Sequence, residues 1–257
     1  MKQAKIGSLA SKAARIFALP VCLVLAWHAF SLAGWVDKLF LPGPGEVLAA
    51  LLNLFSTSEI WPHLWATLMR MFSGFFVALV IAVPAGIVLG HIKKVYLYCE
   101  FLIDFARSIP ATAIFPLFMI IFGVGDEAKI AIVAFSCGFV ILINTIYGVW
   151  NAPKTRIVMA KTLRASGSQI LTKIVFFDAL PDIFAGLRNA VSIALILTVV
   201  CEMFIGTNSG LGFLVFNAKT SYDTPKLYAV IGLLGGIGYF INKGLLRVEG
   251  KVIPWSR

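Results

Sequence analysis

The segment TLRASGSQILTKIVFFDALPDIFAGLR (residues 162–188) separates two long apolar runs of the chain. It contains five charged side chains, Arg164, Lys173, Asp178, Asp182 and Arg188. Charged groups are costly in the bilayer core, where no water solvates them. The segment is therefore too polar to cross a membrane, whereas the flanking runs are apolar enough to do so. This contrast predicts an α-helical membrane protein with a long polar loop outside the bilayer.

Composition supports this prediction. Of the 257 residues, 60% are hydrophobic and only 13% are charged. Soluble domains are about half apolar and about a quarter charged, so a soluble globular fold is excluded. The length suits one integral-membrane domain and leaves no room for a second, soluble domain. The four cysteines lie in apolar runs without CxxC spacing, which indicates small hydrophobic side chains, and we expect no metal site.

Six stretches reach the roughly 20 mostly apolar residues that a membrane-spanning helix needs. They are 16–36, 69–90, 96–123, 130–150, 189–205 and 227–245. A tail (1–15) precedes a single transmembrane domain (16–257), and the longest loop is 151–188. Pro110 and Pro116 should break the third span, because proline removes a backbone donor.

The basic residues predict the orientation. With six spans, sixteen lysines and arginines lie on the side of the termini and four on the opposite side. Because cytoplasmic loops are enriched in such residues, we expect both termini and loop 151–188 to be cytoplasmic. The net charge of +10 then reflects topology, and nucleic-acid binding is disfavoured.

The residue pattern of loop 151–188 predicts two short amphipathic helices with a hinge near Arg164–Gly167. Ser166 or Ser168 can cap the second helix, which Leu180-Pro181 should end. An exposed helix pair with spare apolar residues suits a groove on another protein. Packing on its own bundle or on lipid headgroups remains the alternative.

The same loop resembles the EAA loop of ABC importer permeases, the binding-protein-dependent transport inner-membrane component family. That motif aligns Val158-Met159-Ala160 with EAA and Ile174 with the isoleucine. Arg164 stands at the family's glycine, and Phe177 at its first proline. The coupling residues that the resemblance implies are Ala160, Leu163, Arg164, Ala165, Ser166, Gly167, Ile170 and Ile174.

Other stretches resemble the nitrate, sulfonate and taurine subgroup of this family, in order along the chain. They include LPGPGEV (41–47), RSIPATAIFPLFMIIFGVGDEAKI (107–130) and SGLGFLVFNA (209–218). The resemblance implies a type I ABC importer permease fold in a bacterial cytoplasmic (inner) membrane, passing a small oxyanion inward. It also implies two ATPase subunits, a second permease copy and an extracytoplasmic substrate-binding protein, with ATP and Mg held by the ATPases and no cofactor held by this chain.

Five residues within the expected spans are candidates for a translocation pathway: the polar residues Asp104, Arg107, Asn144 and Glu202, and the helix-breaking Pro110. Asp104 and Arg107 are three residues apart on one helical face and can pair. Ionisable groups at membrane depth usually face the protein interior or a water-filled path. An internally satisfied structural role remains open for each, and for Glu202 a hydrogen bond to a neighbouring helix is the favoured interpretation.

No catalytic residues are expected. The chain lacks a GxxxxGK[ST] phosphate loop and hydrolase signatures such as HExxH or GxSxG. Two rival functions remain: an ion-coupled secondary transporter, which would predict inverted repeats, and a non-catalytic membrane scaffold.

Overall fold

The computed structural model describes the backbone of residues 2–256 and the side chains of residues 18–255. The expected tail 1–15 and the first two residues of the expected span 16–36 therefore lie outside the described side chains. Within the described residues the chain is helical throughout, with no strand. It divides into two compact units, one reaching to Trp61 and including Leu214–Leu233, the other comprising Pro62–Phe213 and the part from Leu234 onward.

The first unit contains α1 (Lys2–Ala33), α2 (Pro44–Ser56) and the parts of α10 (Leu211–Thr220) and α11 (Thr224–Val252) within Leu214–Leu233. Trp27 fixes the turn after α1, because its indole nitrogen donates to the Pro42 carbonyl at 3.0 Å and its ring stacks on Tyr228. The Tyr228 hydroxyl donates to the Phe40 carbonyl at 3.1 Å. The Glu46 side chain accepts from the Gly43 amide at 2.9 Å and caps the start of α2.

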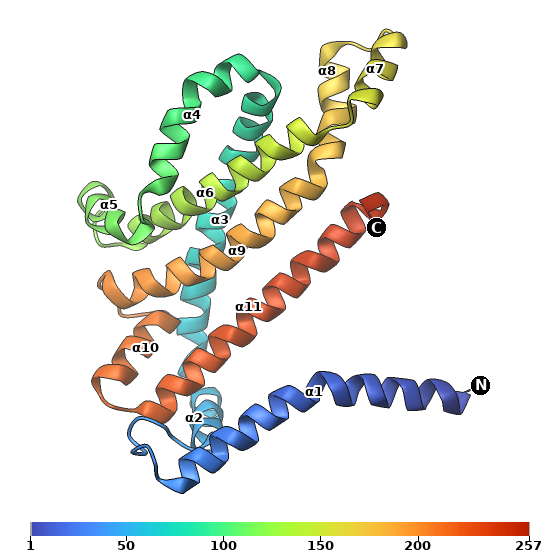
Figure 1. Cartoon of the computed structure of the whole chain (residues 1–257). Helices are drawn as coiled ribbons and strands as arrows, with labels where there is room; N and C mark the ends of the chain where they lie inside the picture. Colours follow the sequence, from blue (N-terminus) through green and yellow to red (C-terminus); the bar gives the residue numbers. More distant parts are fainter. Residues whose placement is uncertain (1, 257) are drawn as a thin grey trace. The chain divides into compact units, whose positions relative to one another are not determined.

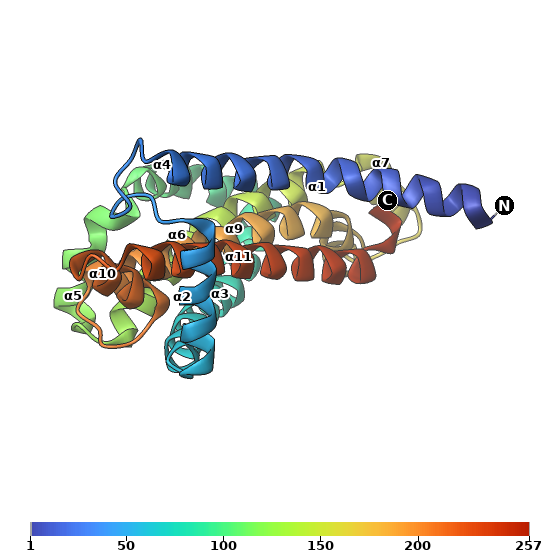
Figure 2. The ribbon, with the colours of Figure 1, turned by 90° about the horizontal axis from the view of Figure 1, so that it is seen from below.

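The second unit is built on α3 (Ile60–His91), α6 (Asp126–Asn151) and α9 (Phe176–Phe204). α6 and α9 run side by side in both views (Figures 1 and 2). Their contact is close: a Cβ added to Gly186 of α9 would lie 2.6 Å from the Cβ of Asn144. Gly86 of α3 meets Thr145 of α6 at the same distance. Glycine at these two positions therefore allows the helices to pack closely within the unit.

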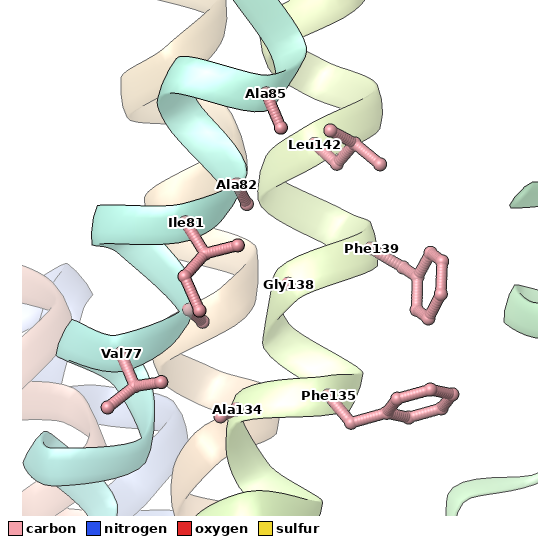
Figure 3. Close-up of a pocket in the computed structure, with 10 residues that line it drawn as sticks. Val77, Ile81, Ala82, Ala85, Ala134, Phe135, Gly138, Phe139 and Leu142 are labelled. Atoms are coloured by element: carbon pink, nitrogen blue, oxygen red, sulfur yellow. The ribbon is translucent and has the colours of Figure 1, made fainter. Parts of the chain in front are cut away.

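Elsewhere along their length, α3 and α6 pack less closely. Small side chains, among them Ala82 and Gly138, leave an apolar hollow of about 280 Å³ between the two helices (Figure 3). Figure 3 shows the rings of Phe135 and Phe139 projecting from α6 on the side away from α3. The two rings therefore point toward the part of the second unit that lies on the far side of α6 from α3.

In the described part of the chain, four helices are long and apolar enough to cross a membrane: Ile60–His91, Asp126–Asn151, Gly167–Phe204 and Thr224–Val252. The expected third span is bent by 88° between α4 (Lys93–Ser108) and the pair formed by η1 (Ala111–Ile114) and α5 (Phe115–Phe122), as Pro110 predicts. Pro116 does not make the predicted break, because it lies in the first turn of α5, where proline is tolerated. With that broken segment the described residues hold up to five spans. Ala18–Ala33, inside the expected first span, is a shorter apolar helix.

One boundary was predicted wrongly. Leu180-Pro181 does not end a helix, because α9 continues through Pro181 to Phe204. A π-helical segment, η2 (Leu171–Val175), joins α8 (Gly167–Ile170) to α9, so the helix is continuous from Gly167. Proline inside a helix costs about 3 kcal/mol. Leu180 and Ile183 are buried in the α6–α9 core, and each buried side chain of this size returns about 1.5–3 kcal/mol.

Candidate functional site

The helix pair predicted in loop 151–188 is present. α7 (Lys154–Thr162) and α8 project beyond the end of the α6–α9 pair (Figure 1). α7 ends in a turn closed by two backbone hydrogen bonds: the Ala165 amide donates to the Ala160 carbonyl at 3.0 Å, and the Arg164 amide to the Lys161 carbonyl at 2.9 Å. This six-to-one and five-to-two pairing is the Schellman motif, which satisfies the last carbonyls of a helix.

The central residue of this turn is Arg164, which has a φ of +58°. A Schellman turn places its C′ residue in the left-handed region, which glycine enters without steric cost. The motif glycine of the resemblance falls on this position. Arginine adopts the same backbone conformation here, so the substitution preserves the turn and adds a long cationic side chain at its exposed tip.

The second helix begins as predicted at Ser166. Its hydroxyl accepts from the Gln169 amide at 3.3 Å, and the Gln169 side chain accepts from the Ser166 amide at 2.9 Å. This reciprocal pair is a capping box. Of the two candidate serines, Ser166 is the cap. Ile170 and Ala160 are buried in the core of the second unit and anchor both helices.

The outer face of the pair is apolar and unusually open. Leu163 is 83% exposed and Met159 is 66% exposed. They border a groove of about 570 Å³ that also includes Ile174, Phe177 and Trp255 from the C-terminal segment. The Phe177 and Trp255 rings lie 6.3 Å apart. Apolar side chains presented on a short helix pair, next to a concave surface, have the form of a protein-binding site.

Two residues that line this groove, Arg156 and Asp178, form an ion pair. Arg156 belongs to α7 and Asp178 to α9, and the Asp178 side chain is 8% exposed. The second Asp178 carboxylate oxygen is buried without a hydrogen-bond partner in the described part of the chain. The ion pair holds α7 against α9, so the helix pair is attached to a long helix and is not a free loop.

A second polar site lies at the far end of α9, around Arg70 of α3. Its guanidinium donates to Asp126, Glu202 and the Ser209 carbonyl, each at 2.8 Å. The Arg70 and Glu202 side chains are almost fully buried, whereas the Asp126 side chain is 56% exposed. One cation therefore joins α3, the first turn of α6, the last turn of α9 and the connection to α10.

Glu202 completes this network. Its carboxylate accepts from the Thr67 hydroxyl and from the Gly212 amide, both at 2.9 Å. Gly210 has a φ of +124°, and a Cβ there would lie 2.2 Å from the Glu202 carboxyl carbon. Only glycine fits that position. All donors and acceptors around the charge pair are thereby matched, as buried ion pairs require.

The predicted pathway residues fall into three separate places. Asp104 and Arg107 pair at 2.8 Å near the end of α4, directly before Pro110, and about half of each side chain is exposed. Asn144 donates to the carbonyl of Val140 on its own helix. Glu202 belongs to the Arg70 network, so the favoured interpretation, a hydrogen bond to a neighbouring helix, is confirmed.

Sequence reasoning missed Arg70, Asp126 and Trp255 as functional candidates. Arg70 carried a signal, because a lone arginine inside an apolar run must find a buried partner. Asp126 and Trp255 carried none, since their contacts depend on the tertiary fold.

Comparisons with known proteins agree with this architecture. Residues 82–243 match the family model described as binding-protein-dependent transport system inner membrane component. A protein of Methanocaldococcus jannaschii named as an ABC transporter permease is 34% identical, over 93% of this chain and 91% of its own. The taurine transport system permease protein TauC of Escherichia coli is 30% identical, over 91% and 86% respectively.

The fold has a close counterpart among solved structures. A chain of the MetNI methionine ABC transporter, in an inward-facing conformation, superposes with a TM-score of 0.67 at 21% sequence identity. The match covers 76% of this chain and 98% of that chain. It shows that the fold is that of a type I importer permease.

The chain belongs to the family of binding-protein-dependent transport system inner membrane components. It is a multi-pass inner-membrane permease of an ABC importer. As the family's name states, transport by its systems depends on a binding protein.

Proposed function

We propose that this permease works as a pair of copies, with one ABC ATPase bound to the α7–α8 helix pair of each copy. ATP and Mg would be bound by those partner subunits. The permease itself performs no chemistry in this scheme. Both termini and the α7–α8 pair lie on the cytoplasmic side, in keeping with the excess of basic residues there.

The observation that carries the proposal is the exposed apolar surface of the helix pair. Met159 of α7 and Leu163 of the following turn are exposed, and two backbone hydrogen bonds close that turn. Large apolar side chains held on a rigid support are typical anchors of protein interfaces. Lys173 lines the same groove, and Lys161 and Arg164 are exposed close to Leu163 in the sequence, which favours an acidic groove on the ATPase.

The link from this surface to the membrane runs through α9. Phe176 and Glu202 are separated by 26 helical residues, or about 39 Å at 1.5 Å per residue. The docking surface and the buried Arg70 network therefore lie at opposite ends of one helix. A rigid-body movement imposed by the ATPase at one end reaches the other end directly, which suits alternating access.

For the substrate we propose a small organic sulfonate such as taurine. The support is the sequence similarity to a taurine permease and to the wider nitrate, sulfonate and taurine subgroup. A separate binding protein would deliver the substrate from the extracytoplasmic side.

The test is co-purification with the cognate ATPase followed by measurement of ATP hydrolysis. Leu163→Asp and Met159→Asp introduce a charge into the apolar face and should abolish both complex formation and stimulated hydrolysis. Thr155→Asp is the matched control, because Thr155 is an exposed residue of α7 that does not border the groove. A wild-type permease that transports without any ATPase would refute the proposal.

A further inference from the structure

The break between α4 and η1 borders a cavity that the proposed ATPase site does not use. It has a volume of about 420 Å³ and lies between the α4–η1 turn, α6 and α9. Its walls are mostly apolar, including Phe135 and Phe139 of α6 and Ile193 and Leu197 of α9. Sites for small organic molecules typically combine such walls with a few convergent polar groups.

Arg107 supplies the charged end of this cavity. It also borders a smaller hollow of about 120 Å³ that Tyr96 of α4 lines, so Arg107 contributes to the walls of both hollows. Asp104 engages only the Nε atom of Arg107. Within the described residues, the two terminal nitrogens have no hydrogen-bond partner. They form a planar pair of donors, the geometry that binds an oxyanion through two oxygens.

Ser136 of α6 is a second polar residue that lines the cavity. Other polar side chains of α6 and α9 bond to a carbonyl four residues earlier on their own helix: Asn144, Thr145, Ser192 and Thr198. Ser136 does not, and its Oγ is buried without a partner in the part of the chain that the structure describes. A buried hydroxyl without a partner is unfavourable, so a ligand that accepts its proton is favoured there.

From these groups we infer that the cavity is a binding site for an amphipathic organic anion, with an oxyanion head on Arg107 and Ser136 and an apolar tail against Phe139 and Leu197. The inference rests on the proposed function and specifies its substrate class. Alkanesulfonates fit both halves of the cavity. Inorganic sulfate and nitrate fit only the charged half, so they bind more weakly.

The test uses the permease–ATPase complex in lipid nanodiscs, without binding protein, and 1-butanesulfonate as the probe in titration calorimetry. Arg107→Gln should weaken binding about tenfold or more, since hydrogen bonds to charged groups are the stronger kind. Ser136→Ala should weaken it by a smaller factor, and Arg107→Lys should retain part of it. Sulfate should bind less tightly than 1-butanesulfonate to the wild-type complex.

Asp104→Asn is the decisive control. It removes the same ion pair as Arg107→Gln but leaves the cation, so binding should be retained or strengthened. Equal loss in both variants would show that the pair is only structural, and would overturn the inference. Absence of 1-butanesulfonate binding to a wild-type complex that still hydrolyses ATP would also overturn it, while leaving the proposed ATPase site intact. Failure to form the complex at all would instead contradict the proposed function.

Discussion

The Arg70 guanidinium lies 2.8 Å from the Glu202 carboxylate, and both side chains are shielded from solvent. The two residues are 132 positions apart in the chain. The pair joins the helix that enters the second unit to the last turn of α9. The proposed ATPase-docking surface lies at the other end of α9. Movement of α9 driven by the ATPase would therefore have to keep or break the Arg70–Glu202 ion pair.

Removing one partner of this pair should be severely destabilising. Arg70→Met leaves the buried Glu202 carboxylate without its cation, and Glu202→Leu leaves Arg70 with only the half-exposed Asp126 carboxylate. Breaking a buried ion pair in this way costs about 3–5 kcal/mol. Thermal unfolding of the detergent-purified protein measures the loss. Asp126→Asn is the control, because the exposed Asp126 carboxylate contributes at most about 1 kcal/mol. If the double variant Arg70→Met/Glu202→Leu is no more stable than the worse single variant, the two side chains are not coupled as the distance indicates.

The turn at Arg164 should tolerate glycine better than arginine. Arg164→Gly removes the left-handed penalty of about 1–2 kcal/mol, partly offset by the greater freedom of glycine when unfolded. The melting temperature should therefore stay the same or rise. Lys161→Gly places the same residue in the right-handed last turn of α7, where glycine has no left-handed penalty to remove, and should destabilise the helix by up to about 1 kcal/mol. Equal loss in both variants would argue against a left-handed conformation at Arg164.

Ser166, and not Ser168, should control the start of α8. Ser166→Ala removes the capping hydrogen bond, worth about 1 kcal/mol, and should increase local opening about fivefold. Limited trypsin digestion after Lys173 reports that opening. Ser168→Ala provides the comparison, since its hydroxyl makes no such bond in the described structure. Matching digestion rates for the two variants would contradict the observed cap.

Gly186→Ala should destabilise the protein, because the α6–α9 contact has no room for an added methyl group. Its new Cβ would lie 2.6 Å from Asn144, and overpacking of this kind costs about 1–3 kcal/mol. Gly138→Ala makes the same change on α6 where nothing lies within 4 Å. It should be neutral or stabilising, because alanine is the better helix former by about 1 kcal/mol. Unfolding in a denaturing detergent distinguishes the two, and a stable Gly186→Ala protein would show looser packing than the structure has.

Local features were largely predictable from the sequence. Apolar run lengths indicated the helices around Met71 and Ile141, and the Ser166 cap and the break at Pro110 follow from short-range backbone chemistry. The same local rules failed at Pro181. Burial of its α9 neighbours Leu180 and Ile183 in the core with α6 outweighs the lost hydrogen bond. The partners of Arg70 depend on tertiary packing, which periodicity alone does not reveal.

The most direct test of the central claim is hydrogen–deuterium exchange of the permease with and without its ATPase. If the ATPase binds the exposed helix pair, amides of residues 154–170 should be protected in the nucleotide-free complex, in which the ATPase is bound but drives no movement. Amides of the 206–212 turn at the other end of α9 should remain unchanged in that complex. Protection that spares residues 154–170 in a complex active in ATP hydrolysis would contradict the account.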